Sequence, residues 1–171
     1  MNISLSIQSK KNEEISVGNW KNLETSLIFN FPSEISKNWL KYNLIFRLPS
    51  NEKEIFREIE FSSENFCLCF KPKNEILKLA LDLENFLNSN SKTYRFEPIE
   101  PSFELILEKT QSKDDLKLYF WLDNGNLLTD AHFTWDALGL RFMCSIEEIR
   151  RFSHNIQQFL QALQDKESPP Q

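Results

Sequence analysis

Glycine and cysteine are both scarce in this chain of 171 residues, which contains three of each. With so few glycines, few positions allow bare backbone to cradle a phosphate, so a glycine-rich nucleotide loop is not expected. Three cysteines are an odd number without a disulfide framework, and the first residues lack the charged flank and long apolar run of a secretory signal. No apolar stretch approaches the roughly 20 residues of a membrane-spanning helix. We therefore expect a reduced, cytoplasmic protein.

Basic residues are also fewer than acidic ones. Twenty basic residues face 25 acidic ones, which gives a net charge of −5 and an isoelectric point near 5.2. Nucleic acids and anionic membranes both require a positive footprint, so neither is an expected direct partner. A basic protein is the better candidate.

Aromatic residues are abundant instead, with 15 Phe, four Trp and three Tyr. The core or an exposed face should therefore be unusually aromatic. At this length one domain can bury roughly 70% of the unfolded surface, so we expect a single domain over residues 1–171.

Apolar residues alternate with period two in most of the chain, which indicates strands with one buried face. Two segments have period 3.6 instead and are predicted helices, residues 76–87 and a second helix that begins after Ser145. Ser145 and Glu148 have the spacing of a capping box, and residues 166–171 should form a flexible tail. The predicted strands cover residues 3–8, 27–31, 39–48, 55–61, 66–70, 93–96, 103–107, 116–122 and 138–144.

This order predicts an α+β fold with a mostly antiparallel, curved or sandwich-like sheet and two packed helices. Three strands precede each helix, so the chain could consist of two βββα halves.

The segment from residue 96 to 142 carries the most distinctive charge pattern. It holds nine acidic residues against three lysines and one arginine. A cluster of carboxylates can occupy the cationic surface of a basic partner and accelerate the encounter over long range.

An ordered set of short motifs resembles the WapI-family immunity proteins, which are bacterial proteins that accompany polymorphic toxins. The resemblance covers residues 38–163 and rests on Asn38-Trp39-Leu40, Glu75 with Leu79, Phe96-Glu97-Pro98, Ser102-Phe103-Glu104-Leu105, Leu118 to Asp123 with Gly125, and Gly139-Leu140-Arg141-Phe142. It implies a non-enzymatic protein without cofactor or metal that neutralises the C-terminal domain of a contact-dependent or secreted toxin. That domain would typically be a basic nuclease.

We expect the partner-binding residues to be mainly acidic, with a few buried anchors of the aromatic or arginine type, and Trp135 is the candidate anchor. The full set is Glu97, Glu100, Asp123, Asp130, His132, Trp135 and Asp136. Two alternatives remain open. Glu97, Glu100 and Glu104 could be the carboxylates of a small hydrolase, or exposed Trp could bind carbohydrate.

Several residues are interpreted as structural. A thiolate metal site at Cys67 and Cys69 would need two further ligands, which only Cys144, His132 and His154 could supply. Both cysteines are therefore expected to be small core residues. Tyr119 and Trp121 are also expected to fill a core. Arg141 should pair with a carboxylate such as Glu104 or Asp123. His132 and His154 match no catalytic motif.

Overall fold

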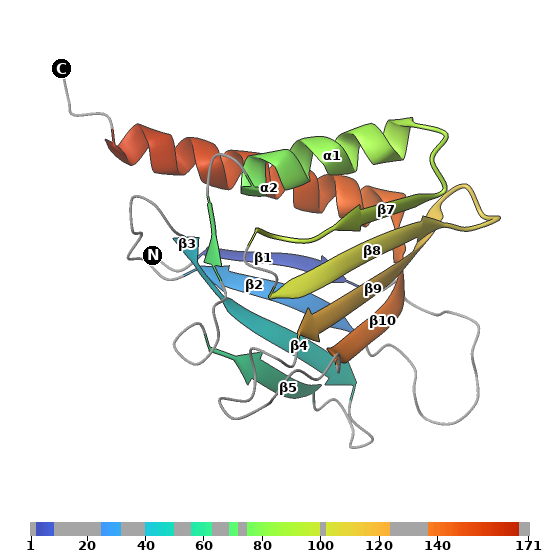
Figure 1. Ribbon diagram of the computed structural model, residues 1–171, viewed down its shortest axis with the longest axis horizontal. Coiled ribbons are helices and arrows are strands. Elements are labelled where there is room, and N and C mark those ends of the chain that lie inside the picture. Colours follow the sequence, from blue (N-terminus) through green and yellow to red (C-terminus); the bar gives the residue numbers. More distant parts are fainter. Residues whose placement is uncertain are drawn as a thin grey trace.

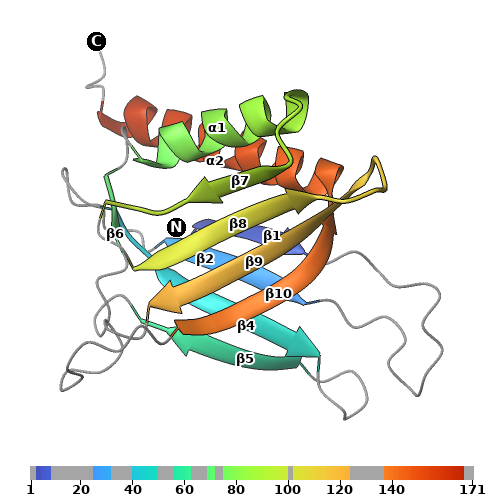
Figure 2. The same ribbon diagram turned by 45° about the vertical axis from the view of Figure 1, so that its right-hand side comes forward.

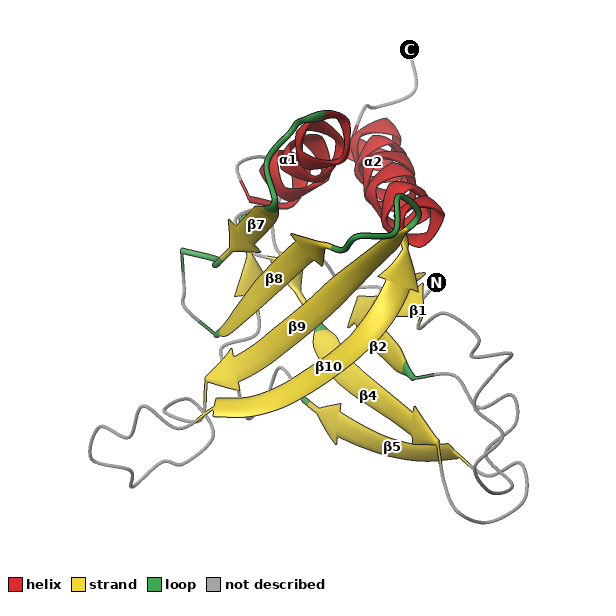
Figure 3. Ribbon diagram, turned by 90° about the vertical axis from the view of Figure 1, so that its right-hand side faces the viewer, coloured by secondary structure: helices red, strands yellow, loops and turns green. Residues whose placement is uncertain are grey.

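The described part of the computed structural model of the protein contains two four-stranded antiparallel sheets, a small two-stranded sheet and two helices (Figure 1), which confirms the α+β prediction. The structure describes residues 3–8, 25–31, 40–49, 56–62, 69–71, 75–99, 102–123 and 137–167. The two four-stranded sheets lie against each other, and both helices run along the same side of the pair (Figure 3). No described helix is long and apolar enough to cross a membrane.

Each large sheet is an antiparallel meander of four strands. The first has the order β1 (Ile3–Gln8), β2 (Ser26–Phe31), β4 (Asn43–Pro49) and β5 (Phe56–Phe61). The second has the order β10 (Ala137–Ser145), β9 (Asp115–Asp123), β8 (Phe103–Lys109) and β7 (Thr93–Phe96).

The segment expected as one strand over residues 39–48 is broken at Tyr42. Residues before the break form β3 (Leu40–Lys41), which pairs with β6 (Cys69–Phe70) outside the large sheets. Tyr42 is fully buried, and its hydroxyl lies 3.4 Å from the Ser102 hydroxyl. The side chain faces the core whether or not the strand continues, so the apolar alternation hides the break.

The two helices begin close to the predicted positions. They are α1 (Leu77–Asn88) and α2 (Ile146–Glu167). Helix α2 therefore includes the first two residues of the expected tail, and the remaining residues 168–171 lie outside the described chain.

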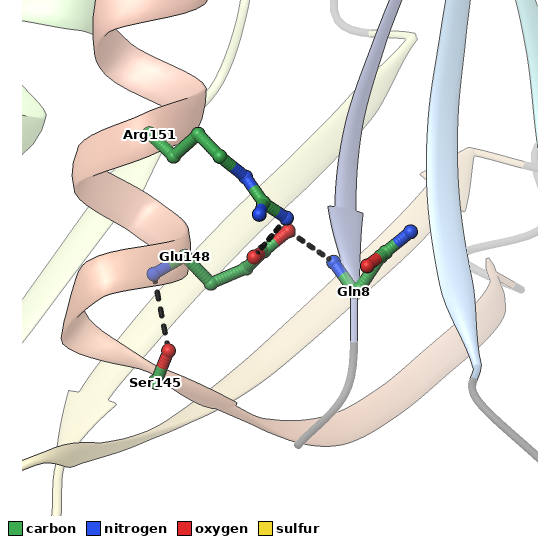
Figure 4. A network of polar contacts seen from close by, with 4 residues as sticks. All are labelled: Gln8, Ser145, Glu148 and Arg151. Carbon is green, nitrogen blue, oxygen red and sulfur yellow. Dashed lines mark hydrogen bonds and ion pairs between the residues drawn. The ribbon is translucent and has the colours of Figure 1, made fainter. Parts of the chain in front are cut away.

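The predicted capping box at the start of α2 forms only in part. The Glu148 N–H donates to Ser145 Oγ at 3.1 Å, as expected of an N-cap serine. The Glu148 carboxylate turns elsewhere (Figure 4): Oε1 accepts the Gln8 backbone N–H at 2.9 Å, and Oε2 pairs with Arg151. The acidic residue thus ties α2 to β1 instead of closing its own cap.

The repeat prediction requires a correction, because each half contributes four strands to its large sheet. Each meander is followed by one helix, and each helix packs beside the first strand of the opposite half, α1 on β7 and α2 on β1. The helices therefore occupy equivalent places. The predicted strand over residues 66–70 is described only as β6, outside the repeat unit.

Phenylalanine rings fill the space between the sheets. Phe29 and Phe46 of the first sheet meet Phe103 and Phe120 of the second, with ring centroids 5.8 Å apart for Phe29–Phe103 and 5.7 Å for Phe46–Phe120. The aromatic composition therefore builds a core shared by both halves.

Candidate functional site

The outer face of the second sheet carries the most distinctive exposed side chains. Leu118, Phe120 and Leu122 of β9 point into the core, so the residues between them point outward. The strand register places Trp121 between Glu104 and Gly139, and Tyr119 between Ile106 and Arg141. This set is called the outer face below.

Trp121 lies against Gly139 on the neighbouring strand. A Cβ atom added at Gly139 would overlap the indole ring carbons, so only glycine leaves room for the ring in this position. The Trp121 side chain is still 38% exposed. The expectation that Trp121 fills the core is therefore wrong, as it is for the half-exposed Tyr119. The period-two pattern that buries Phe120 already requires both neighbours to point outward.

The carboxylates of the outer face already have partners. Glu104 pairs with Arg95 across the strands, and the Tyr119 hydroxyl donates to Glu108 Oε2 at 3.2 Å. The expected pairing of Arg141 with Glu104 is thus replaced by one with Arg95. Arg141 is exposed and makes no ion pair or hydrogen bond with the described residues.

Few of the predicted partner-binding residues fall within the described chain. Glu97 is exposed just after β7, and Asp123 ends β9 opposite Ala137 at the start of β10. The others, Glu100, Asp130, His132, Trp135 and Asp136, lie outside the described residues. The paired residues Asp123 and Ala137 lie at the same end of the sheet as the Trp121–Gly139 pair.

The described residues do not bring the three carboxylates of the hydrolase alternative together in one site. Glu97 is exposed after β7, Glu104 is paired with Arg95 on the outer face, and Glu100 lies outside the described residues. A small cavity is found elsewhere, between the first sheet and the two helices, and its lining is apolar: Leu5, Phe29, Phe31, Ile76, Leu79, Phe152 and Ile156.

Glu75, a residue of the family resemblance, has a structural environment. It is buried, and its carboxylate accepts the backbone N–H groups of Lys71 and Ile99, each at 2.5 Å. These bonds join the start of α1 to the segments on either side of it.

The described cysteine and histidine residues, Cys69, Cys144 and His154, lie on three different elements. Burial raises the pKa of the Cys144 thiol to about 12, so the group is a neutral thiol near pH 7. Cys69 is half-buried in β6, His154 is exposed beside Gln158 on α2, and Cys67 lies outside the described residues. Within the described ranges, no three His, Cys, Asp or Glu residues form a cluster that could hold a metal ion.

Comparisons with protein-family models, with curated proteins and with solved structures found no match to this chain.

Proposed function

We propose that the protein is an immunity protein that binds and neutralises the C-terminal toxin domain of a contact-dependent or secreted polymorphic toxin. The motifs that resemble the WapI family support the class of protein. The observation that carries the proposal is the exposed Trp121, which lies on Gly139 on the outer face of the second sheet. Large exposed aromatic residues on rigid elements are typical anchors of protein interfaces.

In this proposal, the protein inhibits the toxin by covering its substrate-binding surface. A toxin nuclease presents Lys and Arg to its phosphate substrate, so a protein that covers this surface prevents substrate binding. Asp123 lies two residues after Trp121 at the end of β9, and Asp130 and Asp136 follow it in the sequence. Their negative charge would accelerate the encounter, while Trp121 and Trp135 would slow dissociation.

The proposal is tested with the toxin domain encoded beside this protein. We expect the two proteins to co-purify as a stable complex, and we expect expression of this protein to protect cells that produce the toxin domain. The Trp121→Ala variant should bind at least tenfold more weakly, because truncation of a central aromatic anchor typically costs 2 kcal/mol or more. Affinity is measured by titration calorimetry.

Leu81→Ala is the matched control, since Leu81 is also a large exposed apolar residue but lies on α1. Its affinity should equal that of the wild type. Failure of the wild-type protein to bind the toxin domain or to protect cells would exclude the proposed function.

A further inference from the structure

The two large sheets have four edge strands, and three of them are protected against pairing with another chain. Helix α2 packs beside β1, and α1 packs beside the short β7 (Figure 3). Strand β5 has charged, exposed side chains at three of its six positions, Arg57, Glu58 and Glu60. Covering helices, short strands and edge charges are the usual means by which proteins prevent unwanted strand addition.

Strand β10 is the exception. It runs alongside β9 at one side of the second sheet (Figure 2). It has nine residues, pairs with β9 along its whole length without a bulge, and contains a single charged residue, Arg141. No described strand pairs with its other edge. Leu138 near its start is 40% exposed, and Gly139 and Arg141 are also exposed.

The edge of β10 that pairs with no described strand, called the free edge below, is a regular template for a peptide backbone. At about 3.3 Å per residue, a nine-residue strand extends over roughly 30 Å. In an antiparallel sheet, alternate residues direct their N–H and C=O groups to opposite sides, so about half of the backbone groups of β10 face away from β9. An added strand would satisfy these groups with a run of main-chain hydrogen bonds.

We propose that β10 accepts an extended segment of the partner protein as a fifth strand of the second sheet, with an acidic residue of that segment opposite Arg141. The identity of this partner as a toxin domain rests on the proposed function. The acidic residue is inferred because Arg141 has no ion pair with the described residues and projects from the outer face beside the free edge. Opposite charges on directly facing residues stabilise strand pairs.

A second copy of this chain is a poorer occupant of the edge. Antiparallel pairing of the whole of residues 137–145 with its own copy would place Arg141 opposite Arg141. Like charges in directly opposed positions destabilise strand pairing. The edge is therefore better suited to a different protein than to a homodimer.

The experiment uses the full-length protein and the toxin domain encoded beside it. In the complex, NMR-detected hydrogen exchange should slow at every second amide of residues 138–144, those directed away from β9. Arg141→Glu should weaken binding about three- to tenfold, because an attraction becomes a repulsion. Lys113→Glu is the control, since it makes the same charge change at an exposed position of the β8–β9 turn.

The outcomes separate the two proposals. A complex in which β10 exchange is unchanged, or in which Arg141→Glu binds as tightly as Lys113→Glu, would exclude strand addition and leave the proposed function intact. Protection of β10 that appears in the protein alone as its concentration rises would assign the edge to a second copy instead. Absence of any complex would overturn both the proposed function and this inference.

Discussion

At the scale of single residues, Gly139 and Trp121 show how a small side chain can determine the position of a large one. Gly139 lies on an exposed strand position where a side chain would normally be tolerated, yet any Cβ there would occupy the place of the indole ring. Aromatic side chains that cover cross-strand glycines are a recognised stabilising feature of sheets. The pair therefore supplies both stability and the proposed anchor.

We expect Gly139→Ala to displace the Trp121 ring and to lower the free energy of unfolding by about 1 kcal/mol through lost apolar contact. The displacement is followed by the NMR signal of the Trp121 indole N–H, and stability is followed by urea denaturation. In the Trp121→Ala background, Gly139→Ala should no longer be destabilising, because the ring has gone. Equal effects of Gly139→Ala in both backgrounds would contradict this account.

At the scale of elements, the Glu148 carboxylate connects the start of α2 to the end of β1. It accepts the Gln8 N–H and pairs with Arg151, although Gln8 and Glu148 are separated by 140 positions in the chain. Glu147 is its neighbour in the same helical turn, but it is exposed and pairs only with Arg150 in the described structure. Of the two adjacent glutamates, Glu148 therefore connects α2 to β1, whereas Glu147 makes a contact only within α2.

Glu148→Ala should reduce the free energy of unfolding by about 1–3 kcal/mol, because it leaves a half-buried backbone N–H without an acceptor. Glu147→Ala is the control and should cost less than about 1 kcal/mol, as is usual for a surface ion pair. Hydrogen exchange of the Gln8 amide should accelerate only in Glu148→Ala. Equal stability of the two variants would show that the tether contributes nothing.

At the scale of the whole molecule, the two halves share their core. Phe120 of the second sheet stacks on Phe103, with the ring centroids 4.8 Å apart. Its ring also meets those of Phe29 and Phe46 of the first sheet, at centroid distances of 6.1 and 5.7 Å. The helices add further contacts between the halves, since each helix packs beside the first strand of the other half. Neither sheet can bury its inner face without the other.

We expect one cooperative unfolding transition for both halves, with Phe120→Ala lowering the free energy of unfolding by about 3–5 kcal/mol. Ile59→Ala is the control, because Ile59 lies on the edge strand β5 and is 41% exposed; its cost should be below about 1 kcal/mol. Circular dichroism in the far and near ultraviolet should give coincident curves. Two separate transitions would show that the halves fold independently.

Most strands and both helices could be predicted from the sequence, because the periods of two and 3.6 are local properties of the chain. The break at Tyr42 could not, since a buried tyrosine satisfies the same alternation in a continuous strand. For the candidate site, the predicted residues lie mostly outside the described chain. The exposure of Trp121 follows from the same pattern, because alternation with the buried Phe120 and Leu122 places its side chain on the face opposite the core.

The sequence by itself determined which residues alternate, where the helices begin, and that the chain is rich in Phe and poor in positive charge. The tertiary structure alone decided which distant residues meet: Arg95 with Glu104, Glu148 with Gln8, and Trp121 with Gly139. It also decided that β10 is an edge strand among the described strands, while α1 and α2 pack beside two other edges. The physical reason is that periodicity acts over a few residues, whereas these contacts depend on how separate strands and helices pair in space.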